Sequence, residues 1–257
     1  MSIRIIGCGA MGSAIAQALA KSGTQVSVYD LNHTRAKTVS ETIESPLPKA
    51  PLEGVTSDDH ILLAVKPKDL EATANQLKEF NGQLVISILT GVSTEEIKAV
   101  FPKCQVLRMM PNLAVRYRKG TIALAQNPDL PSLLKQEIEK LFSPLGSLHW
   151  IDEEHFDAIT ALTGSGPAFV CTILESMIDS AIAMGLPFDI SYDLIKEMIG
   201  GTLKTLQESN KLPGELKWQC ASPKGTTIYG LRTFEEKGVR SGVIETFLSA
   251  YKRAQEL

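Results

Sequence analysis

A glycine pattern near the start of the chain places the strongest constraint on its fold. Residues 3–6 read Ile-Arg-Ile-Ile, as in a short strand, and Gly7, Gly9 and Gly12 follow with the spacing G-x-G-x-x-G. An Ala-rich stretch at 13–21 then predicts a helix. A strand, a glycine turn and a helix start form the first unit of a dinucleotide-binding fold, in which backbone N–H groups at the helix start favour a pyrophosphate. The spacing alone is weak evidence, but its place directly after a strand makes it specific.

Strands and helices alternate through the first part of the chain. Strands are predicted at 25–29, 61–65, 84–89, 105–109, 121–125 and 147–151, with helices at 34–44, 69–80, 94–101 and 132–142. This alternation implies right-handed crossovers and a parallel sheet with helices on both faces. We therefore expect an α/β, Rossmann-type dinucleotide-binding domain over residues 1–151.

The pattern changes near residue 152, after which only helical periods are predicted. They cover 153–184, 189–209, 226–237 and 240–256, separated by Gly and Pro residues. We expect an all-helical substrate and dimerisation domain over 152–257. So small a helical layer, rich in Ile, Leu, Met and Ala, often completes its core against a second copy, so a homodimer or a larger homo-oligomer is expected. The alternative is that its apolar faces pack only on the first domain.

Composition and charge exclude several classes of function. The formal net charge of -3 and pI of about 5.9 argue against a nucleic-acid or membrane-surface partner. No continuous apolar run approaches the roughly 20 residues of a membrane span, and the first apolar run is cut by glycines, unlike a signal peptide. The cysteines are scattered, as expected of reduced, mostly buried thiols in a cytoplasmic protein, and the histidines lack metal-ligand spacing, so no metal is expected.

An acidic residue ends the second predicted strand, at the position that distinguishes NADH from NADPH in dinucleotide-binding folds. Asp30 lies about 20 residues after the glycines, where a carboxylate accepts from the ribose 2′-hydroxyl and favours NADH. Asn32, Thr34 and Arg35 follow, and they are suited to a 2′-phosphate, as in NADPH. Asp30 is alternatively a cap of the next turn. The residues leave NADH and NADPH both open.

Other candidate residues follow further predicted strands, because ligands of open α/β sheets bind beyond the carboxyl ends of the strands. Lys66, within 64–67, lies beside the nucleotide or is a solvated lysine at a helix start. The backbone of 87–91 is a candidate lining for the nicotinamide. Asn112 is suited either to the cofactor carboxamide or to holding its own loop.

Two stretches of the helical domain do not fit a plain helix. Residues 163–167 place two glycines and a proline in a helical pattern, which costs roughly 1 kcal/mol per glycine and suggests close approach to a ligand or another helix. Residues 221–228 place small hydroxyl residues before a helix whose first N–H groups suit a carboxylate. Ser222 or Thr226 is also a candidate N-cap. No Ser-His-Asp pattern, G-x-S-x-G or Walker lysine is present, so acyl transfer and a P-loop are excluded.

The sequence resembles the pyrroline-5-carboxylate reductase family from Ile3 to about Arg253. The resemblance rests on an ordered set of motifs, of which the Ser-Pro-x-Gly-Thr-Thr stretch in a helical second domain is the most specific. The motifs are Gly7-Cys-Gly-Ala-Met-Gly12, Ala64-Val-Lys-Pro67, Met110-Pro-Asn112, Gly164-Ser-Gly-Pro-Ala168, Pro213-Gly-Glu-Leu-Lys217, Ser222-Pro-Lys-Gly-Thr-Thr-Ile228 and Glu235-Glu-Lys-Gly238.

The resemblance implies reduction of 1-pyrroline-5-carboxylate to L-proline by NADPH or NADH, the last step of proline biosynthesis, in an interlocked dimer. It implies substrate contacts from Ser222, Gly225, Thr226 and Thr227, with the Thr227 hydroxyl on the ring nitrogen, and a substrate-side acid at Glu153. The residues expected at the cofactor are Ile6, Gly7, Cys8, Gly9, Ala10, Met11, Gly12, Asp30, Asn32, Ala64, Val65, Lys66 and Pro67.

The sequence departs from the family pattern in three places: Lys224 replaces a usual glycine, Leu113-Ala114 replaces Thr-Pro, and Asp30 replaces a residue that is small and polar in many members. The altered loop at Lys224 leaves open a reductase of a related cyclic imine. A catalytically silent nucleotide-binding protein is the alternative of another class. Retention of Ser222, Thr226 and Thr227 argues against silence, because a sensor needs no substrate loop.

Overall fold

The computed structural model describes residues 2–257, which fall into two compact units. The first contains the chain up to Gly164 together with Tyr251–Leu257, and the second is Ser165–Ala250. The division lies at the glycine-rich stretch, where a π-helical segment, Thr160–Ser165, interrupts the helical path. The domain boundary expected at 151/152 stays a prediction.

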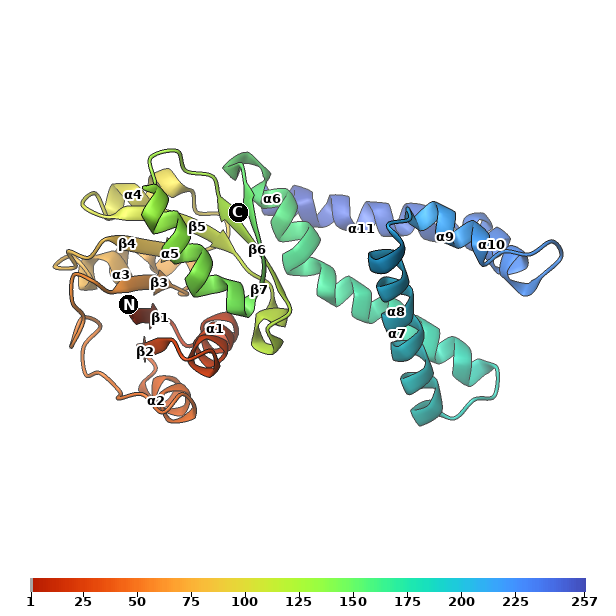
Figure 1. Ribbon diagram of the computed structural model, residues 1–257, viewed down its shortest axis with the longest axis horizontal. Coiled ribbons are helices and arrows are strands. Elements are labelled where there is room, and N and C mark those ends of the chain that lie inside the picture. The colour runs from red at the N-terminus through yellow and green to blue at the C-terminus, as the bar shows by residue number, and fades with distance from the viewer. Residues whose placement is uncertain (1) are drawn as a thin grey trace. The chain divides into compact units, whose positions relative to one another are not determined.

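The first unit is built on a seven-stranded sheet whose strand order reverses at β1 (Figure 1). The order is β2-β1-β3-β4-β5-β6-β7, with β1 (Ser2–Ile6), β2 (Gln25–Tyr29), β3 (His60–Leu63), β4 (Leu84–Ser87), β5 (Gln105–Met110), β6 (Gly120–Ala125) and β7 (Gly146–Ile151). The strands from β1 to β5 pair in parallel, so their carboxyl ends share one edge of the sheet. This confirms the expected Rossmann-type architecture.

One pairing differs from the all-parallel expectation, because β5 and β6 run antiparallel. The connection between them, 111–119, contains only the short 3-10 helix η2 (Leu113–Tyr117). A parallel pairing needs a crossover of about a dozen residues or more, so this connection is too short for it. Strands β6 and β7 are again parallel, because α5 crosses between them.

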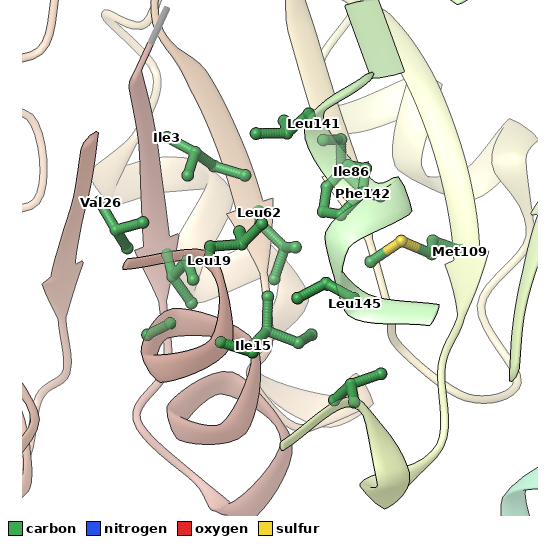
Figure 2. Close-up of a cluster of buried hydrophobic side chains, with 14 of the residues drawn as sticks. Ile3, Ile15, Leu19, Val26, Leu62, Ile86, Met109, Leu141, Phe142 and Leu145 are labelled. Atoms are coloured by element: carbon green, nitrogen blue, oxygen red, sulfur yellow. The ribbon is translucent and has the colours of Figure 1, made fainter. Parts of the chain in front are cut away.

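Helices cover both faces of the sheet, and each face has its own core. On one face α1 (Ala10–Lys21), α2 (His33–Thr42) and α5 (Ser132–Phe142) pack on Ile3, Leu62 and Ile86 among others, as Figure 2 shows in part. On the other face α3 (Leu70–Gln76) and α4 (Thr94–Val100) pack on the alternate strand residues, such as Ile61, Leu63 and Val85. The short η1 (Pro67–Asp69) precedes α3. Residues 61–63 of β3 and 84–86 of β4 are apolar on both faces, as the continuous apolar runs predict.

The rest of the chain is helical, as expected. The short η4 (Glu153–His155) and α6 (Phe156–Ile159) belong to the first unit. Beyond them are α7 (Gly166–Ala183), α8 (Phe188–Ser209), α9 (Pro213–Gln219), α10 (Thr226–Glu236) and α11 (Val239–Ala254). We expected only a break at Pro213-Gly214, but α9 begins there. Proline is tolerated in a first helical turn, and the Glu215 carboxylate accepts from the backbone N–H of Leu212 at 2.7 Å.

The second unit buries almost none of its apolar surface within the chain. In Ser165–Ala250, all of which the structure describes, the buried apolar side chains are Ile178 and Ala181. Its exposed apolar side chains include Val170, Ile173, Met177, Ile182, Met184, Leu186, Phe188, Ile190, Tyr192, Leu194, Met198, Leu203, Trp218, Tyr229 and Phe234. Exposed apolar surface of this extent marks an interaction surface.

The helical path Glu153–Ala183 is long and apolar enough to cross a membrane, by length and composition alone. The expectation that no stretch approaches a span was therefore too strict, although Glu175 and Asp179 interrupt the apolar run. A helix that packs against a partner passes the same test, so this finding is weak evidence for a membrane.

The structure makes the stability of the first unit sensitive to pH through His60. This side chain is 2% exposed in β3, neither ring nitrogen has a hydrogen-bond partner within 2–257, and burial lowers its pKa below 6.5, against the opposing charges of Glu137 and Asp59. Because the unfolded chain then binds the proton more tightly, the free energy of unfolding falls as the pH drops through 6.5 toward the folded-state pKa.

We therefore expect urea unfolding between about pH 7.5 and about pH 5.5 to show a larger loss of stability for the unsubstituted protein than for His60→Leu at equal protein concentration. Equal losses in the two proteins would contradict the assignment to His60.

Candidate functional site

The three glycines of the first loop have different surroundings. Gly7 has φ +109°, and a Cβ there would lie 2.5 Å from the carbonyl oxygen of Ala64. A Cβ on Gly12 would lie 2.0 Å from the carbonyl oxygen of Gly7, whereas a Cβ on Gly9 would meet no atom within 4 Å. Gly7 and Gly12 thus permit close packing, and Gly9 leaves open space above the backbone, as a bound pyrophosphate requires.

The loop leads directly into α1, whose N-terminus has no side-chain cap. Gly9 is the N-cap residue, with φ −68° and ψ −173°. The N–H of Ser13 donates to its carbonyl oxygen at 2.9 Å, and the first N–H groups of the helix have no intrahelical partner. The open space at Gly9 and these N–H groups fit a dinucleotide phosphate.

The Asp30 carboxylate braces this loop. Its Oδ2 accepts from the backbone N–H of Cys8 at 2.7 Å, and its Oδ1 accepts from the N–H of Asn32 at 2.7 Å. Asn32 in turn caps α2, because its Oδ1 accepts from the N–H of Arg35 at 3.1 Å. Asp30 therefore caps the turn, as the alternative interpretation held, and it also holds the glycine loop. A ribose contact by Asp30 stays a prediction.

The thiol of Cys8 is inert in this environment. It is buried, and burial together with the negative charge of Asp30 raises its pKa to about 12. Cys8 therefore contributes its backbone to the loop and stays protonated at neutral pH. Cys104 is also buried but Cys171 and Cys220 are exposed, so the expectation of mostly buried thiols holds for two of the four.

The segment after β3 lies beside the glycine loop. The N–H of Ala64 donates to the carbonyl oxygen of Ile6 at 2.8 Å, which continues the pairing of β1 with β3. Lys66 is exposed and precedes Pro67, the first residue of η1. Residues 6–12, 64–67, Asp30 and Asn32 thus come together at the carboxyl edge where the strand order reverses, as expected.

Two further residues at this edge shape loops. Asn112 is buried, and its Oδ1 accepts from the N–H of Thr121 at 3.2 Å, so it holds the loop after β5. Ser87 is fully buried at the end of β4, and its Oγ accepts from the N–H of Leu89 at 3.2 Å.

Glu153, predicted on the substrate side, makes two contacts within the first unit. Its Oε1 accepts from the backbone N–H of Thr94 at 2.7 Å and pairs with Nη1 of Arg108 at 3.0 Å. Arg108 is 6% exposed and stacks over the ring of Phe156 at 4.8 Å. Sequence reasoning missed Arg108 and Thr94. The available signal was the charge of Arg108 inside the apolar strand Gln105–Met110.

The predicted substrate loop forms a tight turn before α10. The N–H of Gly225 donates to the carbonyl oxygen of Ser222 at 3.0 Å, and Lys224 adopts φ +59°. A Cβ on Gly225 would lie 2.3 Å from Ser222 Oγ, which a rotation of the Ser222 side chain moves away, and 3.2 Å from the Ser222 carbonyl oxygen. Gly225 is the N-cap residue and no side chain caps α10, so the expectation that Ser222 or Thr226 caps it is wrong.

The candidate residues are divided between the two units. The cofactor candidates and Glu153 belong to the first, and Ser222, Gly225, Thr226 and Thr227 belong to the second. Within the described residues 2–257, no group of three His, Cys, Asp or Glu side chains is arranged to hold a metal ion.

Comparison with known proteins also separates an N-terminal from a C-terminal part of the chain, and it assigns Glu153 to the C-terminal part. Residues 153–257 match the family model for pyrroline-5-carboxylate reductase dimerisation, and residues 2–91 match the model described as NADP oxidoreductase, coenzyme F420-dependent. A pyrroline-5-carboxylate reductase of Synechocystis is 34% identical and covers 100% of this chain and 99% of its own. One from Methanosarcina acetivorans is 33% identical, covering 99% and 97%. The chain belongs to the pyrroline-5-carboxylate reductase family.

Solved structures of the family share the whole fold. The 1-pyrroline-5-carboxylate reductase of Streptococcus pyogenes superposes with a TM-score of 0.89 at 26% identity, covering 100% of this chain and 99% of its own. The Plasmodium falciparum pyrroline carboxylate reductase, with NADP bound, gives 0.87 at 25% identity, covering 100% and 97%. The chain is thus an enzyme of the pyrroline-5-carboxylate reductase type, with a Rossmann-type NAD(P)H-binding domain and a helical dimerisation domain.

The glycine geometry predicts opposite outcomes for two single substitutions. Gly9→Ala should fold with an unchanged melting temperature, because its Cβ meets open space, but bind NAD(P)H at least about tenfold more weakly where the phosphate approaches. Gly12→Ala should lower the melting temperature, because its Cβ would overlap the Gly7 carbonyl oxygen. Thermal melts and fluorescence titration of NAD(P)H measure both. Unchanged binding in Gly9→Ala would overturn the assignment.

Proposed function

We propose that this chain reduces 1-pyrroline-5-carboxylate to L-proline with NAD(P)H, the last step of proline biosynthesis, in the cytoplasm. The observation that carries the proposal is full-length similarity to pyrroline-5-carboxylate reductases at 31–34% identity, together with a 222–228 segment that keeps Ser222, Gly225, Thr226 and Thr227. The exposed turn and the uncapped start of α10 support it.

We assign NAD(P)H to the edge formed by residues 6–12, 64–67, Asp30 and Asn32. When bound there, it supplies the hydride. The N–H groups at the start of α1 bind the pyrophosphate, and the Asp30 carboxylate keeps the loop in place through the N–H of Cys8. Asp30 and Arg35 place opposite charges beside this loop. At the Cys8 thiol, burial and the negative charge of Asp30 raise the pKa and the positive charge of Arg35 lowers it.

We assign the substrate to the turn before α10. The N–H groups of Thr226 and Thr227 lie in the first turn of an uncapped helix, which favours the substrate carboxylate there. Lys224 adds a positive charge to the same turn. Ser222 and Gly225 shape the turn, because the Gly225 N–H donates to the Ser222 carbonyl oxygen.

The proposed chemistry needs no strong base. A protonated imine accepts hydride at carbon, its C=N π electrons move to nitrogen, and the product is the secondary amine of proline. The chain orients the two reactants. The hydroxyl oxygen of Thr227 accepts the hydrogen bond of the protonated ring nitrogen and keeps the imine charged.

We also propose that the functional assembly is a homodimer through α7 to α11. The unburied apolar side chains of Ser165–Ala250 and the match of 153–257 to a dimerisation model support this. In this proposed dimer, the apolar path Glu153–Ala183 packs against the partner rather than in a membrane.

Turnover of 1-pyrroline-5-carboxylate by the purified protein tests the proposal. We expect loss of NAD(P)H absorbance with formation of proline. If the Asp30 carboxylate contacts the ribose, kcat/KM is higher with NADH than with NADPH, because this carboxylate repels a 2′-phosphate. The reverse order would refute that part and point to Asn32 and Arg35. No turnover with either cofactor would favour the silent protein, and turnover of other cyclic imines alone would favour the related reductase.

Matched substitutions of Thr227 locate the site in the same assay. Thr227→Val should lower kcat by about tenfold or more, because a lost hydrogen bond of about 1.4 kcal/mol is a factor of ten in rate. Thr227→Ser keeps the hydroxyl and should retain most of the activity. Equal losses in both variants would remove Thr227 from the catalytic role.

A further inference from the structure

We propose that Glu153 is a positioning residue for hydride transfer, which holds the first N–H group of α4 and so fixes the segment 88–93 that follows β4. The proposal rests on the proposed function, because it assigns that segment to the nicotinamide end of the NAD(P)H site. Sequence resemblance suggests direct contact of Glu153 with the substrate, whereas its bonds in the structure lead to α4.

One carboxylate oxygen joins three elements of the first unit. Glu153 Oε1, at the start of η4, accepts from the backbone N–H of Thr94, the first residue of α4, at 2.7 Å. The same oxygen lies 3.0 Å from Nη1 of Arg108, which projects from β5. The direction of the Thr94 N–H is therefore tied to a charged pair outside its own helix.

The arginine is placed to orient the carboxylate rather than to contact solvent. Arg108 is 6% exposed, and its guanidinium carbon lies 4.8 Å from the ring centroid of Phe156, which is fully buried. A buried cation costs several kcal/mol unless it is paired, so Glu153 is the partner that makes this position tenable. The Nε atom of Arg108 and the hydroxyl of Thr94 are buried without hydrogen-bond partners within 2–257. The polar contact between these residues therefore consists of the bonds that Arg108 Nη1 and the Thr94 N–H make to Glu153.

The segment 88–93 lies where the nicotinamide end of the cofactor is expected. Strands β2, β1, β3 and β4 are neighbours and parallel, so the connections after them share one edge. With the pyrophosphate at α1 and the adenosine ribose beside Asp30 after β2, a dinucleotide crosses the edge toward β3 and β4. The segment 88–93 then meets the nicotinamide half, and its far end is fixed by the Glu153 bond.

A positioning role and a substrate contact have different kinetic consequences. Loosening the start of α4 misplaces the nicotinamide face and lowers kcat, because hydride transfer depends steeply on alignment. Binding of NAD(P)H changes little, since the pyrophosphate and ribose contacts lie elsewhere. Loss of a direct substrate contact would instead raise KM for the imine.

The decisive variant is Thr94→Pro, which removes the donated N–H and leaves Glu153 and Arg108 intact. Proline is favoured at the first position of a helix, and Ser93 already has the extended conformation, with φ −75° and ψ 162°, that precedes proline. Thr94→Val is the matched control, because it keeps the N–H and removes only a hydroxyl that has no partner within 2–257.

We expect Thr94→Pro to lower kcat about tenfold, with the dissociation constant of NAD(P)H within about twofold of the unsubstituted value. Thr94→Val should match the unsubstituted protein. Equal kcat values in the two variants, or a cofactor affinity that falls as much as kcat, would overturn the proposal. Absence of turnover in the unsubstituted protein would instead refute the proposed function.

Glu153→Gln provides an independent measurement if Thr94→Pro melts below the assay temperature. The amide oxygen still reaches Thr94 but loses the charge that Arg108 orients, so we expect a smaller fall in kcat with an unchanged KM for the imine. A raised KM for the imine with an unchanged kcat would show that Glu153 touches the substrate and would overturn the positioning role.

Discussion

The close approach of α1 to the ends of β1 and β3 is the contact on which the rest of the first unit depends. It exists because Gly12 lies against the carbonyl oxygen of Gly7, and Gly7 lies against that of Ala64, at distances that no side chain tolerates. This contact places the uncapped start of α1 beside the edge where the strand order reverses. The cofactor site is therefore a consequence of backbone packing before any side chain takes part.

Charged side chains then fix the loops at that edge. Asp30 uses both carboxylate oxygens on backbone N–H groups, one of them in the glycine loop. Glu153 uses a single oxygen, Oε1, which accepts from the backbone N–H of Thr94 at the start of α4 and pairs with Arg108. Both acids lie at ends of elements and bind donors from other segments. The edge thus has two braces, one at the adenosine side and one at the side assigned to the nicotinamide.

Local sequence signals predicted the features that depend on local physics. Glycine spacing located the turn between β1 and α1, and apolar runs located the strands, because parallel strands are buried on both faces. Contacts between distant segments could not be predicted this way. The Arg108–Glu153–Thr94 contact joins β5, η4 and α4, and no period or spacing in the chain records it. The antiparallel direction of β6 results from the short connection after β5. The prediction of a parallel sheet rested on the strand pattern and did not consider the length of that connection.

The turn before α10 combines features that the local sequence predicts with features that only the structure shows. Its small hydroxyl residues marked it in the sequence, but the left-handed conformation of Lys224 emerges only in the structure. A lysine there costs roughly 1–2 kcal/mol more than glycine, a cost that attraction of the substrate carboxylate offsets in the proposed site. The helices around it expose their apolar faces, which the proposed homodimer covers.

The central claim is that hydride passes directly from the cofactor held at the glycine loop to the imine carbon of the substrate bound at the turn before α10. Turnover with NAD(P)H carrying deuterium at both C4 positions, followed by mass spectrometry and NMR of the product, tests it most directly. The account predicts proline with a single deuterium, on the carbon that was the imine carbon. Proline without deuterium, or deuterium at another carbon, would contradict it.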